Sequence, residues 1–310
     1  MKVLITGGAG FIGSHLCDRF IERGCEVLCV DNLSSGKKEN ICHLFDNPLF
    51  EFRKFDAADE NQLSESMIGV DMVCHLAAHP DIQAGSEDPN IDYYHTFLTT
   101  KTVLESMRKK KIKNIFFAST SAVYGNMPET SLNEKTGGLE PVSYYGAYKL
   151  ASEALISSYV HMNDMSALIF RFPNVVGPRL THGVIFDFIK KLKNNKNELE
   201  ILGNGKQKKQ YIHVDDLMNS IMIMSEKMNR GTNLYNVSTE SFATVTEIAD
   251  LVCQRLRLEN VSYKYTGGEI GWKGDVPFFQ YDISKIKSMG WMYNHTSKEA
   301  IRKTLSEMEI

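Results

Sequence analysis

The stretch Gly7-Gly8-Ala9-Gly10-Phe11-Ile12-Gly13 decides how this chain folds. It follows the apolar run Lys2–Thr6 and opens the segment Phe11–Arg23, whose apolar residues recur at helical spacing. Glu26–Val30 is a second buried run, and the acidic residue Asp31 ends it. A strand, a glycine-rich turn, a helix and a second strand that ends in a carboxylate together indicate a dinucleotide site.

The chemistry of this turn predicts which dinucleotide binds. Because glycine has no Cβ, the backbone N–H groups of Gly8–Gly13 can approach a pyrophosphate, and the helix N-terminus adds a favourable dipole. Asp31 can accept hydrogen bonds from the ribose hydroxyls of adenosine, and it would repel a 2′-phosphate. We therefore predict NAD, although Lys37 and Lys38 nearby leave NADP as an alternative. Asp56, after a third strand, is either an adenine contact or a helix cap.

The rest of the first half repeats the alternation of strands and helices. Further apolar runs predict strands at Phe50–Phe55, Asp71–Leu76, Asn114–Ala118 and Ala167–Phe172, and helical spacing predicts helices at Asn90–Lys109 and Ser143–Met162. This alternation is typical of an α/β protein with a Rossmann-type, doubly wound parallel sheet. We expect an NAD-binding domain over 1–175, to which segments near 211–240 and 275–285 return, and a smaller α/β substrate-binding domain mainly over 176–310.

Composition excludes several classes of function. The 310 residues carry a formal net charge of −3, with 43% hydrophobic and 24% charged residues, so nothing indicates a nucleic-acid partner or an anionic membrane. No apolar run approaches the roughly 18 residues of a membrane span, and the N-terminus does not resemble a signal peptide. Six scattered cysteines without a C-x-x-C pair favour free thiols and a cytoplasmic protein.

A second group of residues predicts catalysis. Tyr145 and Lys149 are four residues apart at the start of the helix Ser143–Met162, so they lie on one helical face. A tyrosine is a poor base at pH 7, but a neighbouring ammonium and a positive nicotinamide ring would favour its phenolate. Tyr145 is therefore a candidate to take a proton from a sugar hydroxyl. The strand before it runs into the hydroxyl-rich segment Ala118–Gly125, where a hydroxyl either binds the reacting oxygen or satisfies loop backbone.

These motifs together carry a resemblance to a known family. The segments concerned are Thr6–Gly13, Asp31–Gly36, Leu76–Ala78, Ser119–Gly125, Tyr145 with Lys149, Arg171–Pro178, Gly203–Asp216, Gly271–Pro277 and Asp282–Trp291. The chain resembles the extended short-chain dehydrogenases/reductases, and within them the NAD-dependent sugar-nucleotide epimerase/dehydratase family and its UDP-glucose 4-epimerase-like members. The resemblance covers nearly the whole chain.

The resemblance implies a role for each matching residue. Tyr145 would be the catalytic base, Lys149 would hold the nicotinamide ribose, and Thr120 would be the catalytic hydroxyl. The cofactor would contact Gly7, Gly10, Phe11, Ile12, Gly13, Asp31, Asn32, Ser35, Gly36, Asp56, Ala57, Leu76, Ala77, Ala78, Ser119, Tyr145, Lys149 and Pro173. A nucleotide-sugar substrate would contact Thr120, Tyr145, Asn174, Arg179, Lys209 and Trp272. No metal is implied.

The resemblance also indicates the reaction. Family members that dehydrate the sugar typically carry an acidic pair after the catalytic Thr, whereas this chain has Ser121 and Ala122. This favours a 4-epimerase that acts through a transient 4-keto sugar. The alternatives are another reaction of the family (4,6-dehydratase, 4-reductase, decarboxylase or 2-epimerase) and a non-catalytic NAD-binding regulatory protein.

Three positions depart from the 4-epimerase pattern. Thr96 stands where an Asn is common, Lys209 replaces an Arg, and Trp272 occupies a position that often carries a diphosphate-binding Arg. These changes leave the nucleotide and the sugar undetermined. The family further implies a homodimer that packs through the helices Asn90–Lys109 and Ser143–Met162.

One further cluster invites a different interpretation. His213 with Asp215 and Asp216 has residue types that bind metals, but the segment resembles a junction between a strand and a helix. N-capping of that helix by an aspartate is the preferred interpretation.

Overall fold

The computed structural model describes residues 1–79, 82–127, 131–271, 274–276 and 278–308. The chain divides into two compact units. The first unit consists of 1–125, 139–171 and 220–235, and the second unit of 126–138, 172–219 and 236–310. The chain passes from the first unit to the second between residues 171 and 172. Residues 220–235 belong to the first unit, and residues 275–285 belong to the second unit.

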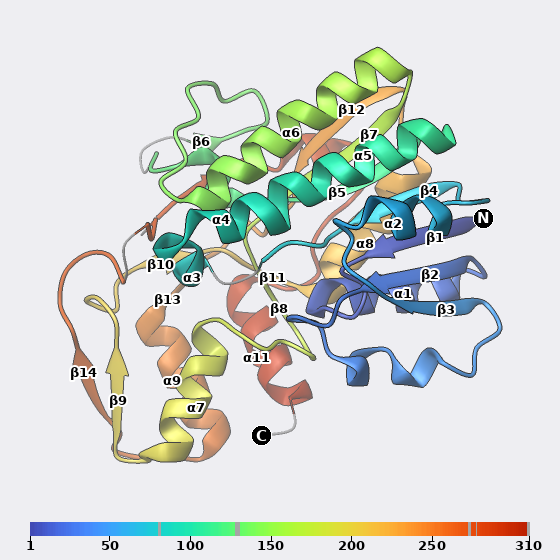
Figure 1. Cartoon of the computed structure of the whole chain (residues 1–310). Helices are drawn as coiled ribbons and strands as arrows, with labels where there is room; N and C mark the ends of the chain where they lie inside the picture. The colour runs from blue at the N-terminus through green and yellow to red at the C-terminus, as the bar shows by residue number, and fades with distance from the viewer. Residues whose placement is uncertain (80–81, 128–130, 272–273, 277, 309–310) are drawn as a thin grey trace. The chain divides into compact units, whose positions relative to one another are not determined.

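A seven-stranded parallel sheet forms the centre of the first unit (Figure 1). Its order is β12-β7-β5-β4-β1-β2-β3, with bounds β1 (Lys2–Thr6), β2 (Glu26–Asp31), β3 (Phe50–Lys54), β4 (Met72–His75), β5 (Asn114–Thr120), β7 (Ser166–Phe172) and β12 (Gly231–Asn236). Val3 on β1 pairs with Val27 on one side and Met72 on the other. The strand order changes direction beside β1, so the predicted Rossmann-type, doubly wound fold is confirmed.

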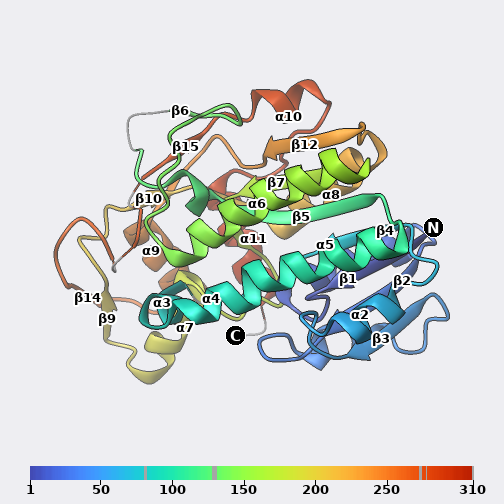
Figure 2. The ribbon, with the colours of Figure 1, turned by 45° about the horizontal axis from the view of Figure 1, so that its top comes forward.

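Helices cover this sheet because their apolar faces pack on the alternating residues of the strands. The helices are α1 (Phe11–Glu22), α2 (Glu60–Ser66), α3 (Ile82–Glu87), α4 (Pro89–Asp92), α5 (Thr99–Lys110) and α6 (Tyr144–Asn163), with short turns η1 (Lys38–Asn40), η2 (Cys42–Leu44) and η4 (Ser121–Tyr124). On one face, Leu63 of α2, Val103 of α5 and Ile156 of α6 share a buried core with Leu4 and Phe117 of the strands. Helices α5 and α6 lie side by side in both views (Figures 1 and 2).

The expected helix Asn90–Lys109 differs in one respect from the prediction. It consists of α4, a π-helical segment η3 (Tyr93–Leu98) and α5. Thr99 Oγ1 donates to the carbonyl of Tyr94, five residues earlier, at 2.9 Å. π-Helical turns are rare and are frequently found at functional sites, and this one contacts α6.

The second unit is built from short strand pairs and helices. Its elements are β6 (Ser131–Leu132), β8 (Asn174–Val176), α7 (Val184–Asn194), β9 (Glu198–Ile201), β10 (Lys208–Lys209), β11 (Tyr211–His213), α8 (Val214–Glu226, whose last residues belong to the first unit), β13 (Ala243–Thr244), α9 (Val245–Leu256), β14 (Ser262–Tyr265), β15 (Gln280–Tyr281), α10 (Ser284–Ser288) and α11 (Ser297–Glu307). The strands pair as β10-β13, β11-β8, β14-β9 and β15-β6. Within the described residues, no helix is long and apolar enough to cross a membrane.

Candidate functional site

The glycine-rich turn joins β1 to α1 and is wound very tightly. A Cβ added to Gly13 would lie 2.1 Å from the carbonyl oxygen of Gly7, so only glycine fits there. Gly10 is the N-cap of α1 and provides no side-chain hydrogen bond, and Phe11 and Ile12 form the first turn. The N–H groups of this turn therefore need partners from outside the helix, which is the arrangement that binds a phosphate.

Asp31 lies at the carboxyl end of β2, beside this turn. Its carboxylate accepts hydrogen bonds from the backbone N–H of Ala9 at 3.0 Å and of Leu33 at 2.8 Å. Burial raises the pKa of Asp31, and the two backbone donors oppose that rise. A Cβ on Gly36 would meet the Asp31 carboxylate, so the segment that carries Ser35 and Gly36 wraps closely around it.

Asp56 follows β3 and faces Asn32 on the loop after β2. The Asn32 amide donates to Asp56 Oδ2 at 3.0 Å, and the backbone N–H of Ala58 donates to Asp56 Oδ1 at 2.9 Å. The N-cap of α2 is Asp59, which accepts from the backbone of residues 61 and 62. Of the two interpretations of Asp56, the helix cap is therefore wrong. Asp56, Asn32 and the buried Ala57 line the same sheet edge as Asp31.

Leu76, Ala77 and Ala78 extend from the carboxyl end of β4, and all three are partly exposed. The strand itself ends in His75, a fully buried residue whose Nδ1 lies 2.7 Å from Thr6 Oγ1 and whose Nε2 lies 3.0 Å from Thr100 Oγ1. Burial, with a smaller effect from the charge of Lys149, lowers the pKa of His75 to about 3. His75 is therefore a neutral link between strands and helix α5.

The start of α6 is held against the end of β5. Ser143 caps α6 by accepting from the backbone N–H of Gly146 at 3.1 Å. A Cβ at Gly146 would lie 2.5 Å from the carbonyl oxygen of Ala122, so glycine at this position lets α6 approach the turn η4. Thr120 Oγ1 accepts from the backbone N–H of Ala122 at 3.2 Å, which leaves its own hydrogen to donate. This packing brings Tyr145 and Lys149 to the strand end that carries Thr120.

Lys149 is buried and its charge is strongly affected by its surroundings. Its Nζ donates to the carbonyl oxygen of Ala118 at 2.8 Å and lies 4.7 Å from the centre of the Phe117 ring. Burial lowers the pKa of Lys149 to about 7, against the opposing effects of Glu153 and Asp92. Lys149 Nζ also lies 5.7 Å from the centre of the Tyr145 ring.

The surroundings of Tyr145 disfavour its phenolate. Burial, with the charge of Asp92 added, raises the pKa of Tyr145 above its ordinary value. The prediction joined the lysine ammonium with a positive nicotinamide ring, and in the protein alone burial and the Asp92 carboxylate both oppose the phenolate. A phenolate at Tyr145 thus depends on further positive charge in the site.

Three charged residues near this site were not predicted. Ser119 donates its hydroxyl to Glu153, and Glu153 forms a buried pair with Arg171. Asp92, fully buried at the end of α4, influences both Tyr145 and Lys149. One signal was present in the sequence, because a single arginine inside the apolar run Ala167–Phe172 needs a buried partner. Ser119, which was predicted to contact the cofactor, donates its hydroxyl hydrogen to the Glu153 carboxylate in this structure.

Of the predicted substrate residues, Thr120 and Tyr145 belong to the first unit. The others belong to the second unit, together with Pro173, which is buried. Asn174 on β8 is exposed, and its side chain hydrogen-bonds the Tyr211 hydroxyl. Lys209 on β10 forms an ion pair with Asp275, and Asp275 Oδ2 accepts from the backbone N–H of Gly271 at 3.0 Å. Arg179 has a left-handed backbone with φ of 68°. Trp272 lies outside the described residues.

The cluster around His213 contains no aspartate that caps α8, although an aspartate N-cap was predicted there. Asp215 and Asp216 lie inside the first turn of α8, so the capping interpretation is wrong. The Asp216 carboxylate instead accepts from the backbone N–H groups of Asn294 and His295, at 3.0 and 3.2 Å. His213, Asp215 and Glu307 lie close enough to share a metal ion, but Lys303 already places a cation against both carboxylates.

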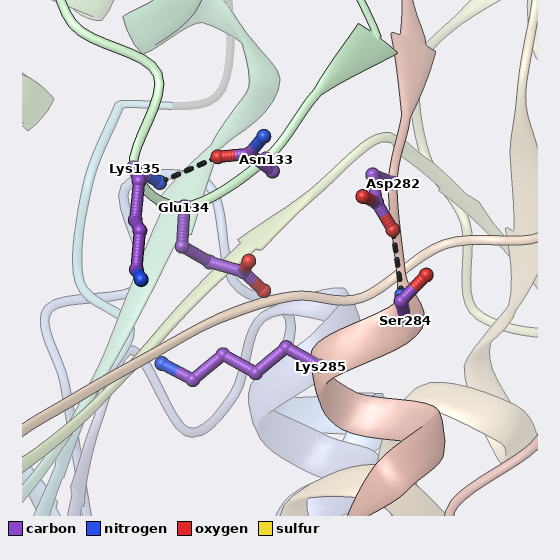
Figure 3. Close-up of a pocket in the computed structure, with 6 residues that line it drawn as sticks. All are labelled: Asn133, Glu134, Lys135, Asp282, Ser284 and Lys285. Atoms are coloured by element: carbon purple, nitrogen blue, oxygen red, sulfur yellow. Dashed lines mark hydrogen bonds between the residues drawn. The ribbon is translucent and has the colours of Figure 1, made fainter.

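A cavity of 430 Å³ lies elsewhere in the second unit. Figure 3 shows that its lining comes from the segment after β6 and from the start of α10, and that the carboxylate of Asp282 accepts from the backbone N–H of Ser284. The lining residues are Asn133, Glu134, Lys135, Asp282, Ser284 and Lys285. None of the predicted site residues is among them, so the candidate site is defined by the residues at the carboxyl ends of the sheet strands.

Comparisons with known proteins agree with this geometry. The chain is 32% identical to a protein of Methanocaldococcus jannaschii provisionally named UDP-glucose 4-epimerase, over 99% of this chain and 98% of that protein. It is 31% identical to UDP-glucuronic acid decarboxylase 1 of Arabidopsis thaliana, over 81% of this chain and 58% of that protein. A crystal structure of a UDP-galactose 4-epimerase superposes with a TM-score of 0.88 at 35% identity, over 99% of this chain and 98% of that structure.

The residues present fit a bound NAD. The uncapped N-terminus of α1 suits a pyrophosphate, and the carboxylate of Asp31 stands beside it at the next strand end. The sequence model of the NAD dependent epimerase/dehydratase family matches residues 3–238. The predicted resemblance and the predicted cofactor are therefore confirmed: the chain belongs to the NAD dependent epimerase/dehydratase family, among the extended short-chain dehydrogenases/reductases, and its cofactor is NAD.

Proposed function

We propose that this protein is a nucleotide-sugar 4-epimerase that acts through a transient 4-keto sugar, with UDP-glucose and UDP-galactose or a related pair as substrates. The observation that carries this proposal is the turn η4 beside Tyr145 and Thr120. Its first two positions are Ser121 and Ala122, so this turn offers no carboxyl group to remove the sugar's 6-hydroxyl. The 4-epimerase relatives support the same reaction.

Each residue of the site has a proposed task in this reaction. NAD, when bound, would supply the acceptor and donor of the hydride that leaves C4 of the sugar and comes back to the opposite face of the 4-keto sugar. Tyr145 accepts the proton of the 4-hydroxyl and gives it back, and the free hydrogen of Thr120 is donated to the reacting oxygen. Lys149 holds the nicotinamide ribose and supplies positive charge beside Tyr145. The turn Gly7–Gly13 and the loops at Asp31, Asp56 and Leu76–Ala78 hold the rest of the cofactor.

We also propose that the second unit holds the nucleotide part of the substrate through Asn174, Arg179 and Lys209. A lysine neutralises phosphate as a point charge, without the bidentate geometry of an arginine. Lys209 lies against Asp275. Asp275 therefore neutralises part of the charge of Lys209, so we expect Lys209 to contribute modestly to the affinity for the substrate.

The reaction is tested by following the sugar directly. The purified protein is incubated with UDP-, GDP-, CDP- and dTDP-sugars without added reductant, and the H1 and H4 signals are recorded by NMR. A 4-epimerase converts one substrate into its C4 epimer and reaches the same mixture from either side. A new methyl signal would identify a dehydratase, loss of carbon dioxide a decarboxylase, and a change at C2 a 2-epimerase. No change in any sugar would indicate a 4-reductase, which needs added reductant, or a regulatory NAD-binding protein. Any of these results would overturn the proposal.

A second candidate function is decarboxylation of a nucleotide-linked uronic acid. A named UDP-glucuronic acid decarboxylase among the relatives favours it. UDP-glucuronic acid is therefore included in the panel.

We further propose a cytoplasmic homodimer. The six cysteines are free and five of them are buried, which supports a reducing compartment. Helix α6 exposes the small residues Ala147 and Ala154, and the aromatic rings of Tyr93, Phe97 and Tyr148 gather between η3 and α6. Small exposed side chains allow a second pair of helices to approach, so α5 and α6 would form a four-helix bundle with their copies.

The dimer prediction is tested by one exposed substitution. Ala154→Glu places a charge on the exposed face of α6, so it should convert the dimer into a folded monomer, because an unpaired charge in an interface is costly. Light scattering after size exclusion measures the mass. Ile68→Glu, at a side chain that is 66% exposed outside these helices, is the control and should remain dimeric. A wild-type monomer would reject the prediction.

A further inference from the structure

Glu153, one helical turn after the proposed catalytic residue Lys149, forms a buried ion pair with Arg171. Arg171 on β7 donates from Nε to Glu153 Oε1 at 3.0 Å and from Nη2 to Glu153 Oε2 at 2.6 Å. Both residues are buried, with exposed fractions of 4% and 6%. Two charges lose much hydration when they are buried, so a pair of this kind is weak as a stabilising device. The ion pair of Arg171 and Glu153 has no role in the reaction proposed above.

The pair is held by elements that also form the active site. Ser119, next to Thr120 on β5, donates its hydroxyl to Glu153. The Arg171 guanidinium lies 4.8 Å from the centre of the Tyr124 ring on η4, and the interaction with Glu153 raises the pKa of Arg171 although burial opposes it. Glu153 is therefore fixed by β5 and β7 together.

Glu153 also acts on Lys149, which precedes it by one turn of α6. Residues four apart on a helix lie on the same face, and the charge of Glu153 opposes the loss of a proton from Lys149. This matters because Lys149 is buried and its pKa lies at about 7. Without an opposing charge, the ammonium would be mostly lost at neutral pH.

The other groups that face Lys149 do not replace Glu153. Asp92 on α4 also favours the ammonium, but less strongly than Glu153 does. His75 on β4 is neutral, and β5 contributes the carbonyl oxygen of Ala118 and the ring of Phe117. The pKa of Tyr145, on the same helix, is raised by burial and by Asp92, so its phenol adds no negative charge beside Lys149.

We propose that Glu153, anchored by Arg171 and Ser119, is a positioning residue that keeps the proton on Lys149. This rests on the proposed role of Lys149 in the site. The guanidinium holds the Glu153 carboxylate in place through two hydrogen bonds, and Glu153 in turn keeps the ammonium charged. Its charge is then available beside Tyr145.

The proton on Lys149 can be observed directly. In protein labelled with ¹³C at the lysine Cε atoms, the Lys149 signal is identified by its absence in Lys149→Met and titrated by NMR without substrate. We expect one lysine midpoint near pH 7. Glu153→Gln should move that midpoint down by about one unit, a tenfold fall in the ratio of charged to neutral lysine at a given pH.

Two further variants make this test decisive. Glu153→Gln leaves Arg171 buried without its partner, so E153Q/R171M removes both charges and should place the midpoint between those of wild type and E153Q. If E153Q fails to fold, the double variant alone carries the test, with a midpoint below that of wild type. Glu105→Gln removes a carboxylate that pairs with Arg108 and contacts Tyr159 of α6, and it should leave the midpoint unchanged.

An unchanged Lys149 midpoint in a folded E153Q or E153Q/R171M protein would overturn the proposal. The titration needs no substrate, so it is independent of which reaction the protein catalyses. In the active enzyme, E153Q should also move the alkaline limb of the pH–rate profile to lower pH. A merely structural role would lower the rate equally at every pH.

Discussion

Tyr145→Phe is expected to reduce turnover by about 10²–10⁴-fold, which is the usual contribution of a positioned acid or base. The substitution removes the one hydroxyl that we propose to exchange a proton with the 4-hydroxyl of the sugar. The phenylalanine ring keeps the shape of the side chain, and no contact of the glycine-rich turn is altered. Binding of NAD and the melting temperature should therefore stay close to those of the wild type.

The neighbouring tyrosine provides the control for this prediction. Tyr144 begins the same helix, but it is 49% exposed, so Tyr144→Phe should retain full turnover. Turnover is measured as formation of the C4 epimer, and bound NAD is measured after denaturation of the protein. A fully active Tyr145→Phe protein would refute the proposed base.

Gly13→Ala is expected to disrupt the cofactor site. The new Cβ would lie 2.1 Å from the Gly7 carbonyl oxygen and 2.8 Å from the Gly8 Cα, both of which are backbone atoms. Relieving such overpacking costs about 1–3 kcal/mol, and each 1.4 kcal/mol is a factor of about ten in affinity. We therefore expect NAD to bind about 10- to 100-fold more weakly, and the melting temperature to fall.

A second glycine shows what the same substitution does without a clash. A Cβ at Gly137 would have no atom within 4 Å, so Gly137→Ala should bind NAD and melt like the wild type. Calorimetric titration with NAD and thermal unfolding measure both proteins. If Gly13→Ala bound NAD as tightly as Gly137→Ala, the assignment of the turn as the pyrophosphate site would be wrong.

Much of the fold was predictable because its signals are local. Apolar runs and helical spacing placed β1, α1, β2 and α6 close to their observed bounds, since each pattern depends on one segment alone. Other elements had no such signal. Strand β12 joins the sheet beside β7, but Gly231–Asn236 contains few apolar residues, and α2 has only seven residues.

The site was predictable in part for the same reason. Tyr145 and Lys149 share a helix, and the motif that they form is visible in one short segment. Asp92 and Arg171 could not be connected with them from the sequence, because they lie on a different helix and on a strand. The spacing of Lys149 and Glu153 was visible, but it does not show whether a glutamate at that position faces solvent or a buried arginine.

The sequence by itself determined the family, the doubly wound sheet, the cofactor and the residues proposed for the chemistry. Each of these depends on residue types at short spacing, which an isolated segment already contains. Only the tertiary structure decided the protonation behaviour of the site. Burial lowers the pKa of Lys149 to about 7, and burial with Asp92 raises that of Tyr145. Desolvation and charge at a buried atom depend on every segment packed around it, and segments distant in sequence meet only when the chain has folded.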